Sequence, residues 1–226
     1  MPVYTLPAFL LTLLVSSIVI AEPIATFEGS KVTYQGMTKG TVEHFLNIRY
    51  AHDTSGLRRF APPEPYTPPE GSEIAATEAG PACPQTQTAL PPFFDETPWI
   101  SEDCLNLRIS RPAGTSAGDK LPVVVWVQGG GVVKGSAYDS HSEPDNLIAL
   151  SEELKKPVIY VTFNYRLTIF GFARLPILKD QQSLNAGMRD QRTAFEWVKD
   201  NIAAFGGDPN RVALFGLSSG GTFSSL

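Results

Sequence analysis

The hydrophobic positions along the chain fall into short apolar runs and two longer periodic segments. The strongest runs are Leu121–Val127, Val158–Phe163 and Val212–Phe215. Because these runs do not alternate with polar residues, we expect strands buried on both faces, at the centre of a largely parallel sheet. Further strands are predicted at Ile24–Phe27, Lys31–Tyr34, Val42–Tyr50 and Leu105–Ile109.

The two periodic segments predict helices between the later strands. The first, Asp145–Lys156, lies between two prolines and carries an apolar side made of Leu147, Leu150 and Leu154. The second, Asn185–Phe205, has an inner stripe of Phe195, Val198, Ile202 and Phe205. Strand, helix and strand in this order predict right-handed crossovers and a doubly wound α/β sheet.

Residues 1–21 are interpreted as a secretory signal peptide. Pro7–Ile20 is apolar and uncharged, too short for a comfortable membrane span, and we place the cut after Ala21. An uncleaved anchor is the alternative. Residues 22–226 then form one predicted domain of a secreted protein, and no second apolar run is long enough to span a membrane.

The charge and the cysteine content of the chain narrow the range of possible functions. The formal net charge of −5, without a cluster of Lys or Arg, argues against a nucleic-acid partner. Cys83 and Cys104 are the only cysteines, and in an exported chain we favour a disulfide over two free thiols. A metal site is not expected, because neither cysteine has a His or Cys partner at ligand spacing.

The loop between the two cysteines contains Phe93, Phe94 and Trp99. Aromatic side chains in such a loop line a substrate entrance or form the loop's own small core. We favour the small core.

The strongest chemical motif follows the last apolar run. Gly216-Leu217-Ser218-Ser219-Gly220 matches the G-x-S-x-G nucleophile elbow, in which a serine stands at a sharp turn between a strand and a helix. The residues two positions either side of the serine must be small, so that the strand and the helix pass closely. A flexible Gly/Ser loop is the alternative.

A glycine run, Gly129–Gly131, follows the run Leu121–Val127 directly. It lacks the Gly-Lys-Ser/Thr order of a phosphate loop, and Lys134 occupies the position of the third glycine in a dinucleotide fingerprint. With the elbow downstream, we interpret it as part of an oxyanion hole, although a simple tight turn is the alternative. In the fold that carries this elbow, the catalytic triad follows the order serine, acid, histidine along the chain. The histidines of this chain all precede Ser218: they are His44, His52 and His141. We therefore expect them to face solvent or lie in loops.

Several longer motifs carry a family resemblance. The chain from Ile24 to its last residue resembles type-B carboxylesterases, the family of the cholinesterases and of secreted fungal lipases and esterases. The motifs are Phe45-Leu46-Asn47-Ile48-Arg49-Tyr50-Ala51, Leu57-Arg58-Arg59-Phe60-Ala61-Pro62-Pro63, Ser101-Glu102-Asp103-Cys104-Leu105-Asn106-Leu107, Asn164-Tyr165-Arg166-Leu167, Asn185-Ala186-Gly187-Met188-Arg189-Asp190-Gln191-Arg192 and Asn201-Ile202-Ala203-Ala204-Phe205-Gly206-Gly207-Asp208-Pro209.

The resemblance implies the N-terminal portion of an α/β-hydrolase fold that hydrolyses small-molecule or lipid esters through an acyl-enzyme, without a cofactor. It implies Ser218 as nucleophile and the N–H groups of Gly130, Gly131 and Ser219 as oxyanion donors. It also implies a Cys83–Cys104 disulfide and structural ion pairs of Arg59 with Glu102 and Arg166 with Asp190. The family's acid and histidine lie downstream and have no counterpart here. Turnover by this chain alone is therefore not expected, and the last apolar run should form an exposed sheet edge.

Four positions depart from the family pattern. Gln128 replaces a His before the glycines, Leu217 replaces the Glu before the nucleophile, Ser219 replaces Ala, and Thr168 stands at a usual Gly. Gln128 and Leu217 favour an alternative to an ester hydrolase, a non-catalytic binding protein like the cholinesterase-like adhesion proteins. A decayed, truncated gene product is a third possibility.

Overall fold

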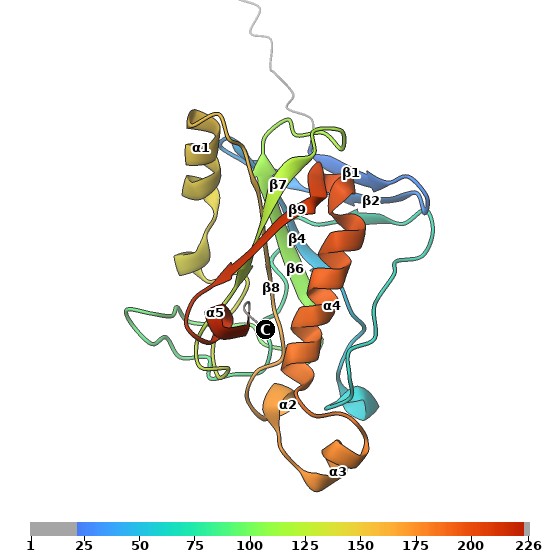
Figure 1. Ribbon diagram of the computed structural model, residues 1–226, viewed down its shortest axis with the longest axis vertical. Coiled ribbons are helices and arrows are strands. Elements are labelled where there is room, and N and C mark those ends of the chain that lie inside the picture. Colours follow the sequence, from blue (N-terminus) through green and yellow to red (C-terminus); the bar gives the residue numbers. More distant parts are fainter. Residues whose placement is uncertain (1–21, 224–226) are drawn as a thin grey trace, which may run out of the picture.

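The computed structural model describes residues 22–223, and the interpretation of residues 1–21 as a signal peptide lies outside the described residues. Two sheets organise the fold (Figure 1). The small sheet has the order β1-β2-β5, with β1 at Ile24–Phe27, β2 at Val32–Gln35 and β5 at Glu73–Ala75. The large sheet has the order β3-β4-β6-β8-β7-β9, formed by Met37–Lys39, Val42–Arg49, Asn106–Pro112, Ile159–Phe163, Leu121–Val127 and Gly207–Gly216 respectively.

The large sheet is mixed. Strands β7, β8 and β9 pair in parallel, but β3, β4 and β6 join the sheet through antiparallel pairings. The expectation of a largely parallel sheet therefore holds only for the β8-β7-β9 portion. The three apolar runs that predicted parallel strands form β7, β8 and β9. The strands from the first half of the chain, β3, β4 and β6, pair antiparallel instead.

Two helices cover opposite faces of the large sheet (Figure 1). Helix α1 (Asp145–Glu153) connects β7 to β8, and α4 (Ala186–Asn201) connects β8 to β9 across β7. Because the two crossovers run in opposite directions along the sheet, the right-handed rule places their helices on opposite faces. The packing agrees: Ile148 of α1 contacts the Trp126 side of β7, and Val198 of α4 belongs to the same core as Val125.

The remaining helical segments are short. They comprise α2 (Thr168–Phe172), α3 (Pro176–Asp180), α5 (Ser219–Phe223) and the 3₁₀ turns Gly56–Arg58, Ser140–Ser142 and Ile202–Phe205. The predicted helix Asn185–Phe205 is thus an α-helix that tightens into a 3₁₀ turn. Val198, Ile202 and Phe205 of its predicted inner stripe are buried.

Helix α1 does not bury the side that its leucines predict. Leu147, Leu150 and Leu154 are 41%, 50% and 62% exposed, whereas Ile148 and Ser151 are buried. Only one narrow face of the helix reaches the sheet, through Ile148 against Tyr160 and Val42. An apolar stripe predicts that a segment is helical, but it does not determine which side of the helix packs against the sheet. In α1 the single contact residue Ile148 fixes the rotation of the helix.

Strand β9 is an edge strand. Every residue of β8 is buried, but Ala213–Phe215 of β9 are exposed, with Leu214 at 40% and Phe215 at 38%. The prediction of a buried strand at Val212–Phe215 is therefore wrong for this chain, because among residues 22–223 β9 pairs only with β7. The related expectation of an exposed apolar edge is confirmed.

Candidate functional site: the turn after β9

The site begins where β7 and β9 end. These strands run in parallel and stay paired to their last residues, Val127 with Gly216. The segments that follow them, Gly129–Gly131 and Leu217–Ser219, therefore leave the same edge of the sheet side by side. A Cβ added to Gly129 would lie 2.5 Å from the Leu217 carbonyl oxygen and 3.2 Å from the Ser218 Cβ.

Ser218 stands at the turn between β9 and α5 in a strained conformation. Its φ is 54°, in the left-handed region that is unfavourable for residues other than glycine, and its side chain is exposed. A Cβ at Gly216 would lie 2.7 Å from the Val127 oxygen, and one at Gly220 would collide with the same oxygen. The structure thus has the close passage of strand and helix for which small residues are needed.

Three backbone N–H groups near this turn have no acceptor among residues 22–223. Gly130 and Gly131 have φ values of 105° and 60°. Within residues 22–223, the N–H groups of Gly130, Gly131 and Ser219 donate no hydrogen bond, although the Gly130 oxygen accepts from Val133 and Lys134. Free N–H groups beside an exposed serine suit the stabilisation of an oxyanion.

A cavity of about 130 Å³ adjoins the turn. Its lining includes Leu217 and Gly129, Phe93 and Phe94 of the disulfide loop, and also Trp126 and His141. Phe93 and Trp99 are 67% and 56% exposed, so the expectation that the loop's aromatics form their own core is wrong. Phe93 and Phe94 instead contribute to the wall of this cavity.

Gln128 and Tyr165 lie beneath the glycine run. Gln128 is 5% exposed, and neither polar atom of its amide finds a partner among the described residues. The Tyr165 hydroxyl donates to the backbone carbonyl oxygen of Gln128 at 3.0 Å. Burial raises the pKa of Tyr165 to about 12, partly offset by the neighbouring Ser219 hydroxyl, so Tyr165 is a neutral support of the loop.

No described histidine is positioned to activate Ser218, whose hydroxyl forms no hydrogen bond with any residue in 22–223. His44 was expected to face solvent or lie in a loop, but it is buried in β4. Its ring contacts the Ser110 hydroxyl at 2.8 Å and Asp145 at 3.2 Å. This Ser-His-Asp triplet is inaccessible to substrate, because Ser110 is fully buried.

His141 is the histidine that shares the cavity with Leu217. A hydrogen bond with Asp139 at 2.8 Å raises its pKa. Asp95, Asp139 and His141 offer ligand atoms that lie within 4.8 Å of one another, the only such group in the described part of the chain. Backbone N–H groups of His141 and Ser140 already occupy these carboxylates, so we assign no metal to them.

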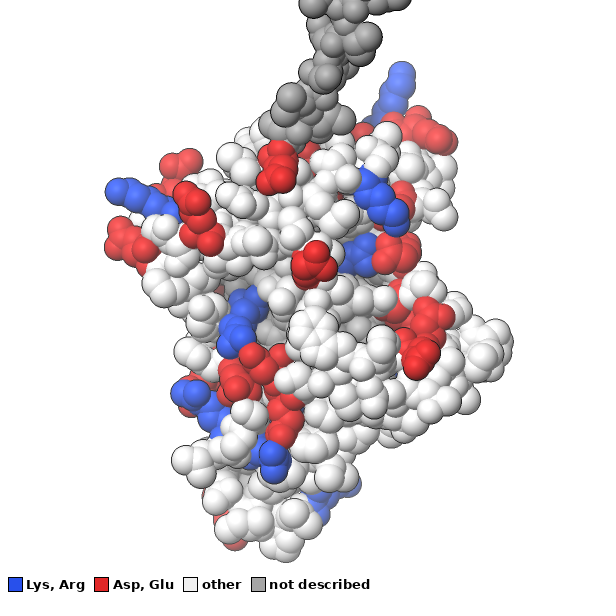
Figure 2. Space-filling model, turned by 180° about the vertical axis from the view of Figure 1, so that it is seen from behind, with Lys and Arg blue, Asp and Glu red and all other residues white. Residues whose placement is uncertain are grey.

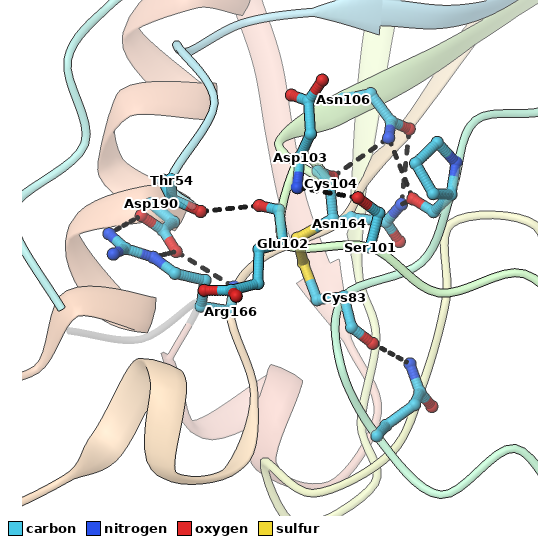
Figure 3. Close-up of a disulfide and its surroundings, with 12 residues drawn as sticks. Thr54, Cys83, Ser101, Glu102, Asp103, Cys104, Asn106, Asn164, Arg166 and Asp190 are labelled. Carbon is cyan, nitrogen blue, oxygen red and sulfur yellow. Dashed lines mark hydrogen bonds and ion pairs between the residues drawn. A yellow bond between two sulfur atoms is a disulfide. The ribbon is translucent and has the colours of Figure 1, made fainter. Parts of the chain in front are cut away.

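The disulfide and ion pairs brace the loops around the site (Figure 3). Cys83 and Cys104 are bonded, with 5.0 Å between their Cα atoms. Arg59 binds the Glu102 carboxylate at 2.6 Å beside the disulfide. The described residues thus contain the disulfide and this first ion pair.

Arg166 and Asp190 form the second predicted pair, which is buried. Two guanidinium nitrogens bind the carboxylate at 2.8 and 2.7 Å. In Figure 3 the Arg166 side chain, from the segment after β8, points at Asp190 on α4. Two residues beyond Arg166, Thr168 begins α2 with a φ of 54°, which explains why glycine suits its position.

The fold and the elbow define an α/β-hydrolase. The solved structure of a thermophilic PNB esterase superposes with a TM-score of 0.77 and 38% identity, over 90% of this chain and 40% of the esterase. Aspergillus niger EstA gives a TM-score of 0.75 and 34% identity, over 91% of this chain and 37% of EstA.

Sequence comparison identifies the family. A model of the carboxylesterase family matches residues 16–226. A secreted lipase of Arthroderma benhamiae is 47% identical over 92% of this chain and 36% of the lipase. The inactive carboxylesterase-like protein VdtD of Byssochlamys spectabilis is 48% identical over 86% of this chain and 33% of VdtD. The chain belongs to the carboxylesterase family, and it spans about a third of the length of these two relatives.

Two surface properties complete the description. Within residues 22–223 no helix is both long and apolar enough to cross a membrane. On the face seen in Figure 2, acidic and basic side chains are interspersed rather than gathered into one basic patch.

Proposed function

We propose that this chain is the N-terminal part of a secreted carboxylic-ester hydrolase that works through a serine acyl-enzyme. The observation that carries the proposal is the position of Ser218, exposed and strained at the end of β9 beside three N–H groups that have no acceptor among residues 22–223. Family membership supports ester substrates, either small molecules or lipids, and no cofactor takes part in the proposed reaction.

In the proposed reaction, the Ser218 Oγ attacks the carbonyl carbon of the ester. The negative charge that develops on the carbonyl oxygen is stabilised by the N–H groups of Gly130, Gly131 and Ser219. The C–O bond to the alcohol then breaks, and the alcohol leaves with the proton that Ser218 gave up. Water hydrolyses the acyl-enzyme in the second half of the reaction.

A base must take the proton from the Ser218 hydroxyl and deliver it to the leaving alcohol. The histidines of residues 22–223 do not contact the Ser218 hydroxyl, and the family resemblance assigns this role to a histidine downstream of the serine. We therefore expect the 226-residue chain alone to hold a nucleophile and an oxyanion hole without turnover. In the proposed complete protein, a downstream acid and histidine activate Ser218.

The proposal is tested on the native secreted product. An antibody against residues 22–226 should capture a species much larger than the 24.5 kDa of this chain, and the captured protein should react with a fluorophosphonate probe and hydrolyse a short-chain nitrophenyl ester. Ser218→Ala should abolish both signals. Ser219→Ala is the matched control, because it removes a neighbouring hydroxyl but keeps the backbone N–H. An unlabelled product of any size would contradict an activated serine.

The second candidate function is non-catalytic binding. It is favoured by Leu217, which is 61% exposed and lines the cavity at the position where a family carboxylate is expected, and by the similarity to VdtD. A binding protein would keep the fold but leave the probe unreacted. The same labelling experiment therefore separates the two functions.

Secretion is a further part of the proposal. It is supported by the apolar leader and by the similarity to a secreted lipase. The secreted protein should begin at Glu22, which mass spectrometry of its N-terminal peptide would show. A protein that retains Met1 would argue for an anchor.

A further inference from the structure

A second cavity in the described residues lies away from the elbow. It has a volume of about 570 Å³, is open to solvent, and is lined by the turn after β1, the segment 66–68 and the end of α4. Ala117, before β7, is at its rim, whereas the glycine run follows β7. Since β7 has seven residues, the two sites are roughly 20 Å apart. We call this space the β1–α4 cavity.

Aromatic side chains form much of its wall. Phe27, Tyr66 and Trp197 come from β1, the Pro-rich segment and α4, and the rings of Phe27 and Trp197 lie 6.4 Å apart at 54°. Trp197 is only 8% exposed, and its indole N–H donates to no residue in 22–223. Aromatic faces attract cations as well as apolar groups.

The charged side chains in the cavity lining are all acidic, although the Arg49 guanidinium lies over the Tyr66 ring, 5.3 Å from its centroid. Glu28 and Asp200 are in its lining and exposed, and neither forms an ion pair with a described residue, while the lining contains no Lys or Arg. The two carboxylates favour a positive ligand.

We propose that the β1–α4 cavity binds a small organic cation, an alkyl or aryl ammonium, against the aromatic wall of Phe27 and Trp197 with Glu28 and Asp200 as counter-charges. The volume lies within the range of small-molecule sites, and the combination of aromatic faces with unpaired carboxylates is the chemistry that recognises ammonium groups. The site uses none of the residues of the proposed esterase centre.

The test is direct binding of benzyltrimethylammonium to the 226-residue chain, measured by ligand-observed NMR and by calorimetry. We expect saturable binding that is competed by choline, with benzyl alcohol binding at least about fivefold more weakly because it lacks the charge. The double variant Glu28→Gln/Asp200→Asn should weaken ammonium binding by about tenfold. Glu152→Gln/Asp180→Asn, on exposed carboxylates of α1 and α3, is the matched control and should bind like the wild type.

Three results would overturn the proposal. They are the absence of saturable binding to the folded chain, equal binding of benzyl alcohol, and equal losses in the two double variants. Ser218→Ala should leave ammonium binding unchanged. A failure of the proposed esterase function is thereby distinguished from a failure of this site.

Discussion

Replacing Asp190 by Asn should cost a large share of the stability of this domain. Asp190 is fully buried and Arg166 is 2% exposed. The carboxylate accepts from the Arg166 backbone N–H at 3.0 Å and from two guanidinium nitrogens. Asn has nearly the same shape, so the change leaves the Arg166 charge in place without a counter-charge. A third guanidinium contact, to the Ala61 oxygen at 2.7 Å, holds the side chain where it is.

The magnitude follows from the burial of both partners. Removing one partner of a buried ion pair costs about 3–5 kcal/mol, against a total of roughly 5–15 kcal/mol for a domain. Urea unfolding with the disulfide intact, monitored by circular dichroism, measures this loss of unfolding free energy. The matched control is Glu196→Gln, which breaks the exposed Arg192–Glu196 pair further along α4 and should cost less than about 0.5 kcal/mol.

A second variant separates charge from packing. In Arg166→Met/Asp190→Leu both charges are absent, and we expect most of the lost stability to return, because apolar replacements of buried pairs are often neutral. A loss of less than about 1 kcal/mol in Asp190→Asn would refute the reasoning. So would equal losses in Asp190→Asn and Glu196→Gln.

Three further predictions concern stability. Burial, and secondarily Arg108, lower the pKa of His44 below its ordinary 6.5, so the unfolded chain binds the proton more tightly than the folded chain. Stability should therefore fall as the pH drops below 6.5, and His44→Gln should flatten this part of a plot of urea midpoint against pH. Converting Cys83 and Cys104 to Ser should cost about 3 kcal/mol for a separation of 21 residues, measured by urea unfolding, and no loss would contradict the loop-entropy argument. Thr168→Gly should raise stability by about 1 kcal/mol in the same assay, because Thr168 has a positive φ; a decrease would mean that its side-chain contacts outweigh the backbone strain.

The elbow was predictable because its requirements are local. Gly216 and Gly220 are needed where a strand and a helix pass each other, and the apolar run before them predicts the strand. The glycine run was predictable for a similar reason, since it directly follows the strand that pairs with β9. Family-level motifs then supplied the partners of Arg59 and Arg166, which lie 43 and 24 residues away and which local sequence does not indicate.

The β1–α4 cavity and the role of the disulfide loop were not predictable in this way. Phe27, Tyr66 and Trp197 belong to three distant segments, and no spacing in the sequence relates them. The sequence predicts that Phe93, Phe94 and Trp99 form a small core within their own loop, but Phe93 and Phe94 line a cavity together with Leu217 and Gly129.

The sequence by itself indicated the positions of the chief strands and helices, the sharp turn at Ser218, the glycine run and the favoured disulfide between the two cysteines. Each of these depends on apolar periodicity, on the backbone freedom of glycine or on motifs of adjacent residues. Tertiary structure alone decided which face of α1 is buried, that β9 is an exposed edge and that His44 lies in the interior. Burial depends on which segments come to cover a residue, and those neighbours are distant along the chain.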